Sequence, residues 1–290
     1  MSATDRKFPH FHGDDIPQSA PADAAFHVIP VPFEASVSYG SGTRNGPDAI
    51  LHASTQLEAY IDGAVPGDAG IYTAPFVECD SDAATTLDRI EKAVTKTLDL
   101  GKTPFLLGGE HTISIAPALA LQKRGIDFGI VQFDAHADLR DTYQNNPNSH
   151  ACVMKRALDL GIPIFQIGVR ALSQAEASLR AKEKIPYVDA DSIARHGIPE
   201  SLLPDSFPKK IYISFDVDCL DPSLLPSTGT PEPGGLNWYQ AIEGLEKVIQ
   251  GRTVIGADVV ELAPTENHHA SEFIAAKLVY KIMDLILKSQ

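Results

Sequence analysis

The sequence predicts an α/β fold with a mainly parallel sheet and helices on both of its faces. Short apolar runs rich in Val, Ile and Phe alternate with longer segments in which apolar residues recur at helical spacing. Strands separated by helices pair in parallel through right-handed crossovers, which place the helices on both faces of the sheet. The chain has 290 residues, 43% of them hydrophobic, which is enough for one large core.

Each expected element has a local reason. Phe26–Val31 is a short apolar run and is expected to form the first strand. Gly46-Pro47 opens the first helix, because proline suits a first helical turn. The apolar spacing over 82–100 predicts the second helix. Further strands are expected at 103–107, 128–133, 163–168, 185–188, 210–215 and 254–260, and further helices at 113–122, 150–160, 173–182, 238–248 and 270–287.

Composition limits the class of protein. Residues 26–290 are expected to form a single domain after a loose arm over residues 1–25, because no repeat or long linker divides the chain. The formal net charge of −14 argues against nucleic acid and anionic membrane as partners. Three scattered cysteines fit a reducing compartment. No run approaches the roughly 18 apolar residues of a membrane span, so a cytoplasmic protein is expected.

Acidic residues and histidines follow two of the buried strands at the point where each strand ends. Asp134, His136 and Asp138 come directly after one strand, and Asp216 and Asp218 close another. In extended chain, alternate side chains point the same way, so these groups are expected to converge. Carboxylates packed at such density repel one another unless cations hold them. The pattern therefore predicts a metal site.

The number and type of these side chains predict two metal ions. With the histidine that follows the strand at 103–107, the candidate ligands are His111, Asp134, His136, Asp138, Asp216 and Asp218. Four carboxylate charges balance two divalent cations that share bridging aspartates. Oxygen-rich ligation without a thiolate favours Mn²⁺ over Zn²⁺. Two such ions about 3.5–4 Å apart would lower the pKa of a shared water and place it for attack, so metal-assisted hydrolysis is expected.

Three segments resemble the signatures of the ureohydrolase family, which includes arginase and agmatinase. They are GGEHT at 108–112, DAHAD at 134–138 and SFDVDCLDP at 214–222. Segments 42–50 and 229–236 are similar to further family motifs, and the resemblance covers the chain from Val28 onward. It implies an arginase-like three-layer α/β/α fold and two Mn²⁺ per chain. The implied ligands are His111, Asp134, Asp138 and Asp216 for one ion and Asp134, His136, Asp216 and Asp218 for the other.

The resemblance also implies an activity: hydrolysis of a small cationic guanidino substrate to urea and an amine, by a homotrimer or homohexamer. Glu261 matches the family's guanidinium-binding position, and a carboxylate can clamp a guanidinium bidentately. His150 resembles the family's proton-shuttling histidine, whose pKa suits proton transfer near neutral pH. Asp138 joins them as a catalytic residue. Thr230, with Glu261 and His150, is expected to contact the substrate.

The loop over residues 139–149 bears on the substrate. It looks like the loop of agmatinases rather than that of arginases, so agmatine, which would give putrescine, is the favoured substrate. Guanidinobutyrate, other guanidino acids and aminopropylagmatine stay open, because one or two side chains at the mouth of a pocket can decide between them. Arginine is a less favoured alternative.

Three other interpretations are open to test. A thiol nucleophile at Cys152 is disfavoured, because residues i and i+2 of a helix, here His150 and Cys152, do not face each other. A deacetylase-type site would hold a single zinc with fewer carboxylates. A catalytically silent binding protein would be expected to lack at least one ligand, whereas all six are present. Metal content and urea release separate these interpretations.

Overall fold

The computed structural model describes residues 8–79 and 82–289; residues 1–7 of the expected arm, residues 80–81 and Gln290 lie outside the described part. One sheet of eight strands runs in the order β2-β1-β3-β8-β7-β4-β5-β6, and every neighbouring pair is parallel. The strands are β1 (Phe26–Val31), β2 (Ile71–Thr73), β3 (Thr103–Gly108), β4 (Gly129–Phe133), β5 (Ile164–Ile167), β6 (Tyr187–Val188), β7 (Lys210–Asp216) and β8 (Thr253–Val260).

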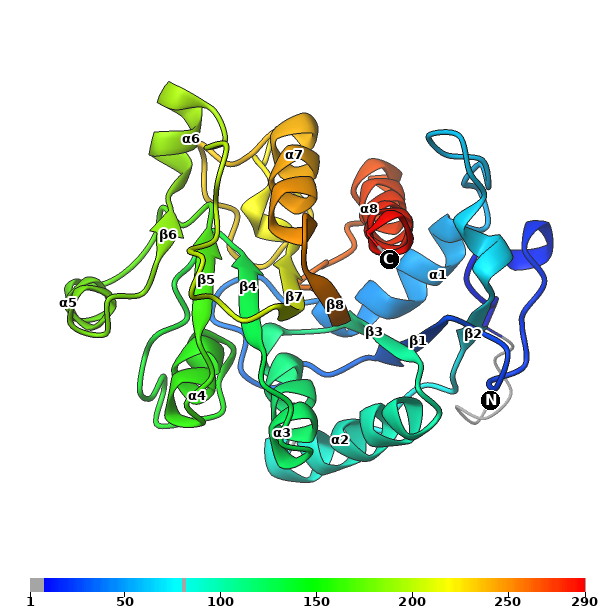
Figure 1. Ribbon diagram of the computed structural model, residues 1–290, viewed down its shortest axis with the longest axis horizontal. Helices are drawn as coiled ribbons and strands as arrows, with labels where there is room; N and C mark the ends of the chain where they lie inside the picture. The colour runs from blue at the N-terminus through cyan, green and yellow to red at the C-terminus, as the bar shows by residue number, and fades with distance from the viewer. Residues whose placement is uncertain (1–7, 80–81, 290) are drawn as a thin grey trace.

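Helices cover both faces of this sheet (Figure 1). In that view α1, α7 and α8 lie on one face, and α2, α3 and α4 lie on the other. The predicted α/β fold with a parallel sheet between two helical layers is therefore confirmed. The helices are α1 (Gly46–Ser54), α2 (Ala83–Asp99), α3 (Ile115–Lys123), α4 (Val153–Asp159), α5 (Gln174–Lys182), α6 (Ala190–His196), α7 (Trp238–Ile249) and α8 (His269–Lys288). Within the described residues, no helix is both long and apolar enough to cross a membrane.

Capping side chains fix where several helices begin. The Asp82 carboxylate accepts two backbone N–H groups in the first turn of α2. Reciprocal capping boxes start α5, between Ser173 and Glu176, and α7, between Asn237 and Gln240. Each cap satisfies N–H groups that have no partner inside the helix. The helix starts inferred near these residues are confirmed within one or two positions.

The structure also contains elements that the sequence pattern does not predict. Strand β2 has three residues and helix α6 has seven, too few to show a clear period. The expected helices at 113–122 and 150–160 each begin later than predicted, because 3-10 turns at His111–Ser114 and His150–Cys152 precede α3 and α4. Both turns lie at the edge of the sheet where the polar clusters gather, so their geometry is set by tertiary contacts.

Four central strands bring the polar clusters to one place. The carboxyl ends of β3, β8, β7 and β4 are neighbours in the sheet, where ligand sites of parallel sheets occur. Gly109, just after β3, allows a close approach at this edge: a Cβ there would lie 1.9 Å from the carbonyl oxygen of Phe33. The chain around Phe33 can therefore pack directly on the end of β3.

The described part of the N-terminal arm, residues 8–25, packs on the helical layer of α1 and α8. Phe11 and Ile16 are buried in the same apolar core as these helices. The backbone N–H of His12 donates to Ser54 Oγ at 2.9 Å, and the His12 ring lies 4.1 Å from the ring of Tyr280. His12 is 1% exposed, and neither of its ring nitrogens has a hydrogen-bond partner among the described residues. Burial, chiefly, lowers the pKa of His12 to about 4.

We expect acid to destabilise the protein partly through His12. Because the folded pKa lies below the unfolded value of 6.5, protons bind the unfolded chain first, and stability falls as the pH drops from 6.5 toward 4. The expected loss between about pH 7.5 and pH 5 is up to about 2 kcal/mol. His12→Phe, which has no titrating group, should lose less stability over the same interval when thermal unfolding of both proteins is compared. Equal losses would contradict this assignment.

Candidate active site

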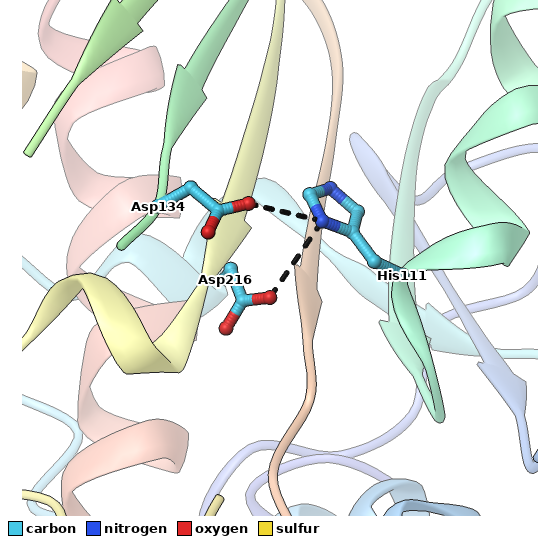
Figure 2. A group of neighbouring side chains, drawn as sticks. All are labelled: His111, Asp134 and Asp216. Carbon is cyan, nitrogen blue, oxygen red and sulfur yellow. Dashed lines mark ion pairs between the residues drawn. The ribbon is translucent and has the colours of Figure 1, made fainter. Parts of the chain in front are cut away.

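Three predicted ligands from three strands meet at one point (Figure 2). His111 follows β3, Asp134 follows β4, and Asp216 is the last residue of β7. Figure 2 shows the His111 ring pointing between the two carboxylates. Its Nδ1 lies 3.2 Å from Asp134 Oδ2 and 3.6 Å from Asp216 Oδ2. One ligand atom from each residue lies within 4.8 Å of the others, close enough to hold one ion.

A second such group shares Asp134 with the first. Asp134, His136 and Asp218 also offer ligand atoms within 4.8 Å of one another. His136 Nδ1 lies 2.9 Å from Asp218 Oδ2 and 3.6 Å from Asp134 Oδ1. The sixth predicted ligand, Asp138, approaches His111 Nδ1 to 3.0 Å through Oδ2. The structure therefore brings all six residues together, in two groups with Asp134 between them.

The side chains converge by a different route from the one inferred from the sequence. The prediction assumed extended chain, but Asp218 lies in a 3-10 turn, Val217–Cys219. Asp138 has a positive φ of 52°, a left-handed conformation that is uncommon for a residue with a side chain. The extended-chain explanation was therefore wrong for these two residues. Turns achieve the convergence because the backbone must bend where the chain leaves the sheet.

Negative charge is crowded at this point. Asp134, Asp138, Asp216 and Asp218 are each at most 5% exposed. Burial, followed by the charge of Asp134, raises the pKa of Asp138 to about 7. Burial and the neighbouring Asp218 raise the pKa of Asp216 well above its usual range. For His136, burial lowers the pKa, but nearby carboxylates outweigh burial and raise it to about 12. These shifts show that the cluster favours added positive charge.

Backbone N–H groups orient the carboxylates. Asp134 Oδ1 accepts from the His136 N–H at 2.6 Å. Asp218 Oδ1 accepts from the Ala135 N–H at 2.9 Å, and Asp216 Oδ1 accepts from the Asp218 N–H at 2.9 Å. Each carboxylate is thereby fixed through one oxygen by the chain that carries another ligand. Oxygen lone pairs of these carboxylates that accept no hydrogen bond are available to bind an ion.

The hydrogen bonds of His111 fix its tautomer. The Ser214 hydroxyl donates to Asp258 Oδ1 at 2.8 Å, so it accepts the N–H of His111 Nε2 at 2.9 Å. The lone pair of the neutral ring is then on Nδ1, which is buried and has no hydrogen-bond partner among the described residues. A neutral imidazole whose other nitrogen donates to an oriented acceptor is the usual form of a metal-binding histidine. The site therefore fits divalent ions.

Glu261 lies beside this cluster, directly after β8, with a positive φ of 66°. Its Oε1 accepts the backbone N–H of His111 at 2.6 Å, while no described residue donates to Oε2. Burial, and then the charge of Glu110, raise the pKa of Glu261 well above its usual range. A cation beside Oε2 would lower this pKa and so stabilise the charged form of the carboxylate.

His150 is oriented by a chain of hydrogen bonds that starts at Glu110. The Ser36 hydroxyl donates to Glu110 Oε1 at 2.7 Å, so it accepts the N–H of His150 Nδ1 at 3.1 Å. The lone pair of the neutral imidazole is then on Nε2. Burial, chiefly, lowers the pKa of His150, so the ring is neutral at neutral pH. Glu110 also accepts the N–H groups of Ala35 and Ser36 at 2.7 Å, which holds this loop in place.

A cavity of about 490 Å³ opens onto the cluster. It is lined by predicted ligands and by Glu261, His150 and Thr230, so the expected substrate-contacting residues face the same space.

Burial raises the pKa of the Cys152 thiol to about 11, so little thiolate forms at neutral pH. A thiol nucleophile is therefore unsupported by its surroundings.

Sequence reasoning did not find Arg170, which holds the loop after β7. Its guanidinium donates to the carbonyl oxygens of Asp218 at 2.7 Å, Glu232 at 2.8 Å and Pro233 at 3.1 Å. The loop that carries Thr230 is thereby tied to a predicted ligand. No local pattern around Arg170 indicates this role, because these three acceptors lie 48 to 63 positions away.

We expect Arg170→Met to destabilise the protein and to weaken metal binding. Several carbonyl oxygens, most of them partly buried, would lose their donor, which is expected to lower the free energy of unfolding by about 3 kcal/mol. The stability and Mn²⁺ affinity of Arg170→Lys should lie between those of the original protein and Arg170→Met, because an ammonium group cannot replace all the N–H donors of a guanidinium. Thermal unfolding and Mn²⁺ titration measure both effects. The control Arg195→Met removes an exposed ion pair with Asp191 and should leave stability nearly unchanged; an equal effect of the two Met variants would refute the assignment.

Comparisons with known proteins agree with this site. Residues 24–284 match the model of the Arginase family. The chain is 40% identical to the N(1)-aminopropylagmatine ureohydrolase of Synechocystis sp., over 93% of this chain and 91% of that protein. It is 32% identical to the agmatinase of Pyrococcus horikoshii, over 93% of this chain and 95% of that protein. The solved structure of the agmatine ureohydrolase of Thermoplasma volcanium matches with a TM-score of 0.85 and 29% identity, over 98% and 96%. The chain therefore belongs to the arginase family of metal-dependent ureohydrolases.

Proposed function

We propose that this protein is a binuclear manganese hydrolase that cleaves agmatine, or an agmatine substituted on its amine, to urea and an amine. The observation that supports it most is that two ligand groups share Asp134, and that the other five predicted ligands line one cavity together with Glu261 and His150. Four carboxylates and two imidazoles, without a thiolate among them, form a donor set that suits Mn²⁺. The six residues that would hold the ions are His111, Asp134, His136, Asp138, Asp216 and Asp218.

Metal ions and protein residues would have separate tasks. When bound, two divalent ions lower the pKa of a water held between them and so supply a nucleophile at neutral pH. The four aspartates would hold the ions and balance their charge. Asp138 would act on the reaction through the ion that it holds. The protein then has to orient the guanidinium and move protons.

Glu261 would bind the guanidinium. Its free Oε2 faces a cavity that a planar cation could enter, and its raised pKa means that a cation is needed beside it to stabilise the charged form. A charge-assisted hydrogen bond to a guanidinium nitrogen meets this need. Because Oε1 is held by the His111 N–H, the carboxylate cannot turn away, and the guanidinium carbon is placed next to the predicted ligand cluster.

His150 would move the proton that the leaving amine needs. Its Nδ1–H is held by Ser36, so the lone pair on Nε2 is available to take a proton and pass it on. A group of this kind contributes about 10²- to 10⁴-fold to a hydrolytic rate. The lowered pKa of His150 keeps the acceptor form populated at neutral pH.

The part of the substrate beyond the guanidinium, its tail, distinguishes agmatine from the other candidate substrates. The loop at 139–149 favours agmatine, while the relative with 40% identity is named an N(1)-aminopropylagmatine ureohydrolase, which makes that compound a second candidate. Both share the guanidinobutyl group that would contact Glu261. Three cysteines scattered along the chain, at positions 79, 152 and 219, suit a reducing compartment, so a cytoplasmic location is proposed; a homo-oligomer stays a prediction.

We expect the Mn²⁺-loaded protein to release urea from agmatine, from N(1)-aminopropylagmatine, or from both. Arginine and guanidinobutyrate, whose carboxylates change the charge of the tail, should give kcat/KM values about 100-fold lower. Chelation should abolish urea release, and Mn²⁺ should restore it. Metal analysis should find two ions per chain.

Glu261→Gln tests the proposed guanidinium contact, because it keeps an acceptor for the His111 N–H but loses the negative charge. It should lower kcat/KM by about 100-fold, as expected for a charged hydrogen bond to substrate, while two ions stay bound. A silent binding protein would release no urea from any guanidine. A content near one ion per chain would point instead to a deacetylase-type site.

Ser36 gives a test of the histidine that is independent of metal binding. Ser36→Ala is expected to lower kcat about 10-fold, because the Nδ1–H loses the acceptor that is held by Glu110 and keeps only the Ser149 hydroxyl, at 3.3 Å, as a neighbour, so the active tautomer is less firmly fixed. His150→Asn should lower kcat by about 100-fold or more. The double variant should be no slower than His150→Asn, since both changes act through one group. Ser41→Ala, an exposed serine of the same loop, serves as the control; additive losses would contradict the proposed chain.

A further inference from the structure

Two glutamine side chains lie fully buried between the sheet and the helical layer that contains α3 and α4. Gln132 on β4 and Gln166 on β5 are 0% exposed. They are direct register partners in the parallel pair β4–β5, and apolar neighbours in both strands pack in the same layer. A buried amide is destabilising by several kcal/mol unless its donors and acceptor are satisfied. The partners of these amides therefore need an explanation.

Hydrogen bonds join the two amides into a chain that ends at Asp134. Arg180 on α5 donates from Nε to Gln166 Oε1 at 3.0 Å. Gln166 Nε2 donates to Gln132 Oε1 at 2.6 Å. Gln132 Nε2 donates to Asp134 Oδ2 at 2.7 Å. We call Arg180, Gln166 and Gln132 the amide relay.

The direction of the relay is fixed at both ends. An arginine can only donate and an ionised carboxylate can only accept, so neither amide can turn over without placing two donors or two acceptors face to face. The second N–H of each amide is also used: Gln166 donates to the carbonyl oxygen of Ala137 at 2.7 Å, and Gln132 to that of His136 at 3.3 Å. Both amide dipoles therefore point their positive ends toward Asp134.

The target of the relay is the residue common to both ligand groups. Asp134 Oδ2 faces His111 and receives Gln132 Nε2, while Asp134 Oδ1 faces His136 and receives its backbone N–H. Each oxygen thus has one N–H donor and faces one of the two histidines that would hold the ions. Such a pair of donors fixes the plane of the carboxylate, which decides whether its two oxygens can serve two ions at once.

We propose that Arg180 is a positioning residue of the metal centre, which orients Asp134 through Gln166 and Gln132. The inference rests on the proposed function, because the ions are those of the same site. Arg180 itself is anchored outside the relay: Nη1 and Nη2 contact the Asp189 carboxylate at 3.1 and 2.9 Å, and its guanidinium lies 3.7 Å over the Tyr187 ring. A charge on α5 thereby sets the affinity of a site to which it contributes no ligand.

The experiment measures Mn²⁺ binding to metal-free protein by calorimetry, together with the electron paramagnetic resonance signal of coupled Mn²⁺ pairs. Gln132→Met, similar in size but without a donor, should weaken binding by about 10- to 100-fold, as expected for loss of a hydrogen bond to a ligand. Arg180→Met should weaken it by about 10-fold and reduce the coupled signal. Arg180→Lys, which keeps a donor near Gln166 Oε1, should recover part of the loss.

A second variant keeps the test valid if Arg180→Met unfolds. Gln166→Glu has the same shape and keeps a partner for Arg180, but it offers an acceptor where Gln132 Oε1 needs a donor. Gln132 would have to turn and present its oxygen to Asp134 Oδ2, so Mn²⁺ binding should weaken by about 10-fold or more without a loss of thermal stability that would indicate unfolding.

Two controls separate the relay from the stability of α5. Asp189→Asn loses the ion pair but leaves Arg180 Nε on Gln166, and Arg195→Met on α6 removes an exposed pair. Arg195→Met should bind Mn²⁺ within about twofold of the original protein, in keeping with the small effect of exposed charge pairs. Asp189→Asn, which removes one anchor of Arg180 but not its hydrogen bond to Gln166, should weaken Mn²⁺ binding less than Arg180→Met does. The relay is refuted if Gln166→Glu and Arg180→Met bind two ions with unchanged affinity, or if Asp189→Asn weakens binding as much as Arg180→Met. If the original protein binds no Mn²⁺, the proposed function fails instead.

Discussion

Four buried carboxylates within reach of one another are the constraint on which the rest of this structure depends. At most 5% of each residue is exposed, and burial, followed by mutual repulsion, raises the pKa values of Asp138 and Asp216. A cluster of this kind is stable only if donors and cations surround it. The described structure supplies donors to these carboxylates: backbone N–H groups from the turns and the buried Gln132 amide behind Asp134.

The supporting hydrogen bonds come from both sides of the cluster. On one side the buried amides of β4 and β5 lead to Asp134. On the other, Ser214 and Tyr212 of β7 both donate to Asp258 of β8, and Ser214 orients His111. The ligands are thus held by neighbouring strands of a rigid sheet, which suits a site whose geometry must be maintained while a substrate binds and leaves.

Two residues beside the cluster have a strained backbone. Asp138 and Glu261 both have positive φ, which costs about 1 kcal/mol or more for a residue with a side chain. Contacts hold both conformations in place: the Asp138 carbonyl accepts the N–H groups of Met154 and Lys155 at the start of α4, and the Glu261 N–H donates to the Gly109 carbonyl. Two of the three residues for which the sequence predicts catalytic roles therefore have a strained backbone.

The sequence alone determined the order of the main strands and helices and the chemical type of the site. Apolar periodicity is a local property, and the carboxyl ends of parallel strands must meet, so the six candidate ligands and Glu261 could be found without coordinates. Only the tertiary structure decided how the clusters bend toward one another and which side chains support them. The partners of Asp134, His150 and Arg170 lie in other strands and loops, and Ser36 is 114 positions from His150. A hydrogen bond between such distant residues leaves no periodic trace in the sequence, because it depends on where the folded chain places each donor.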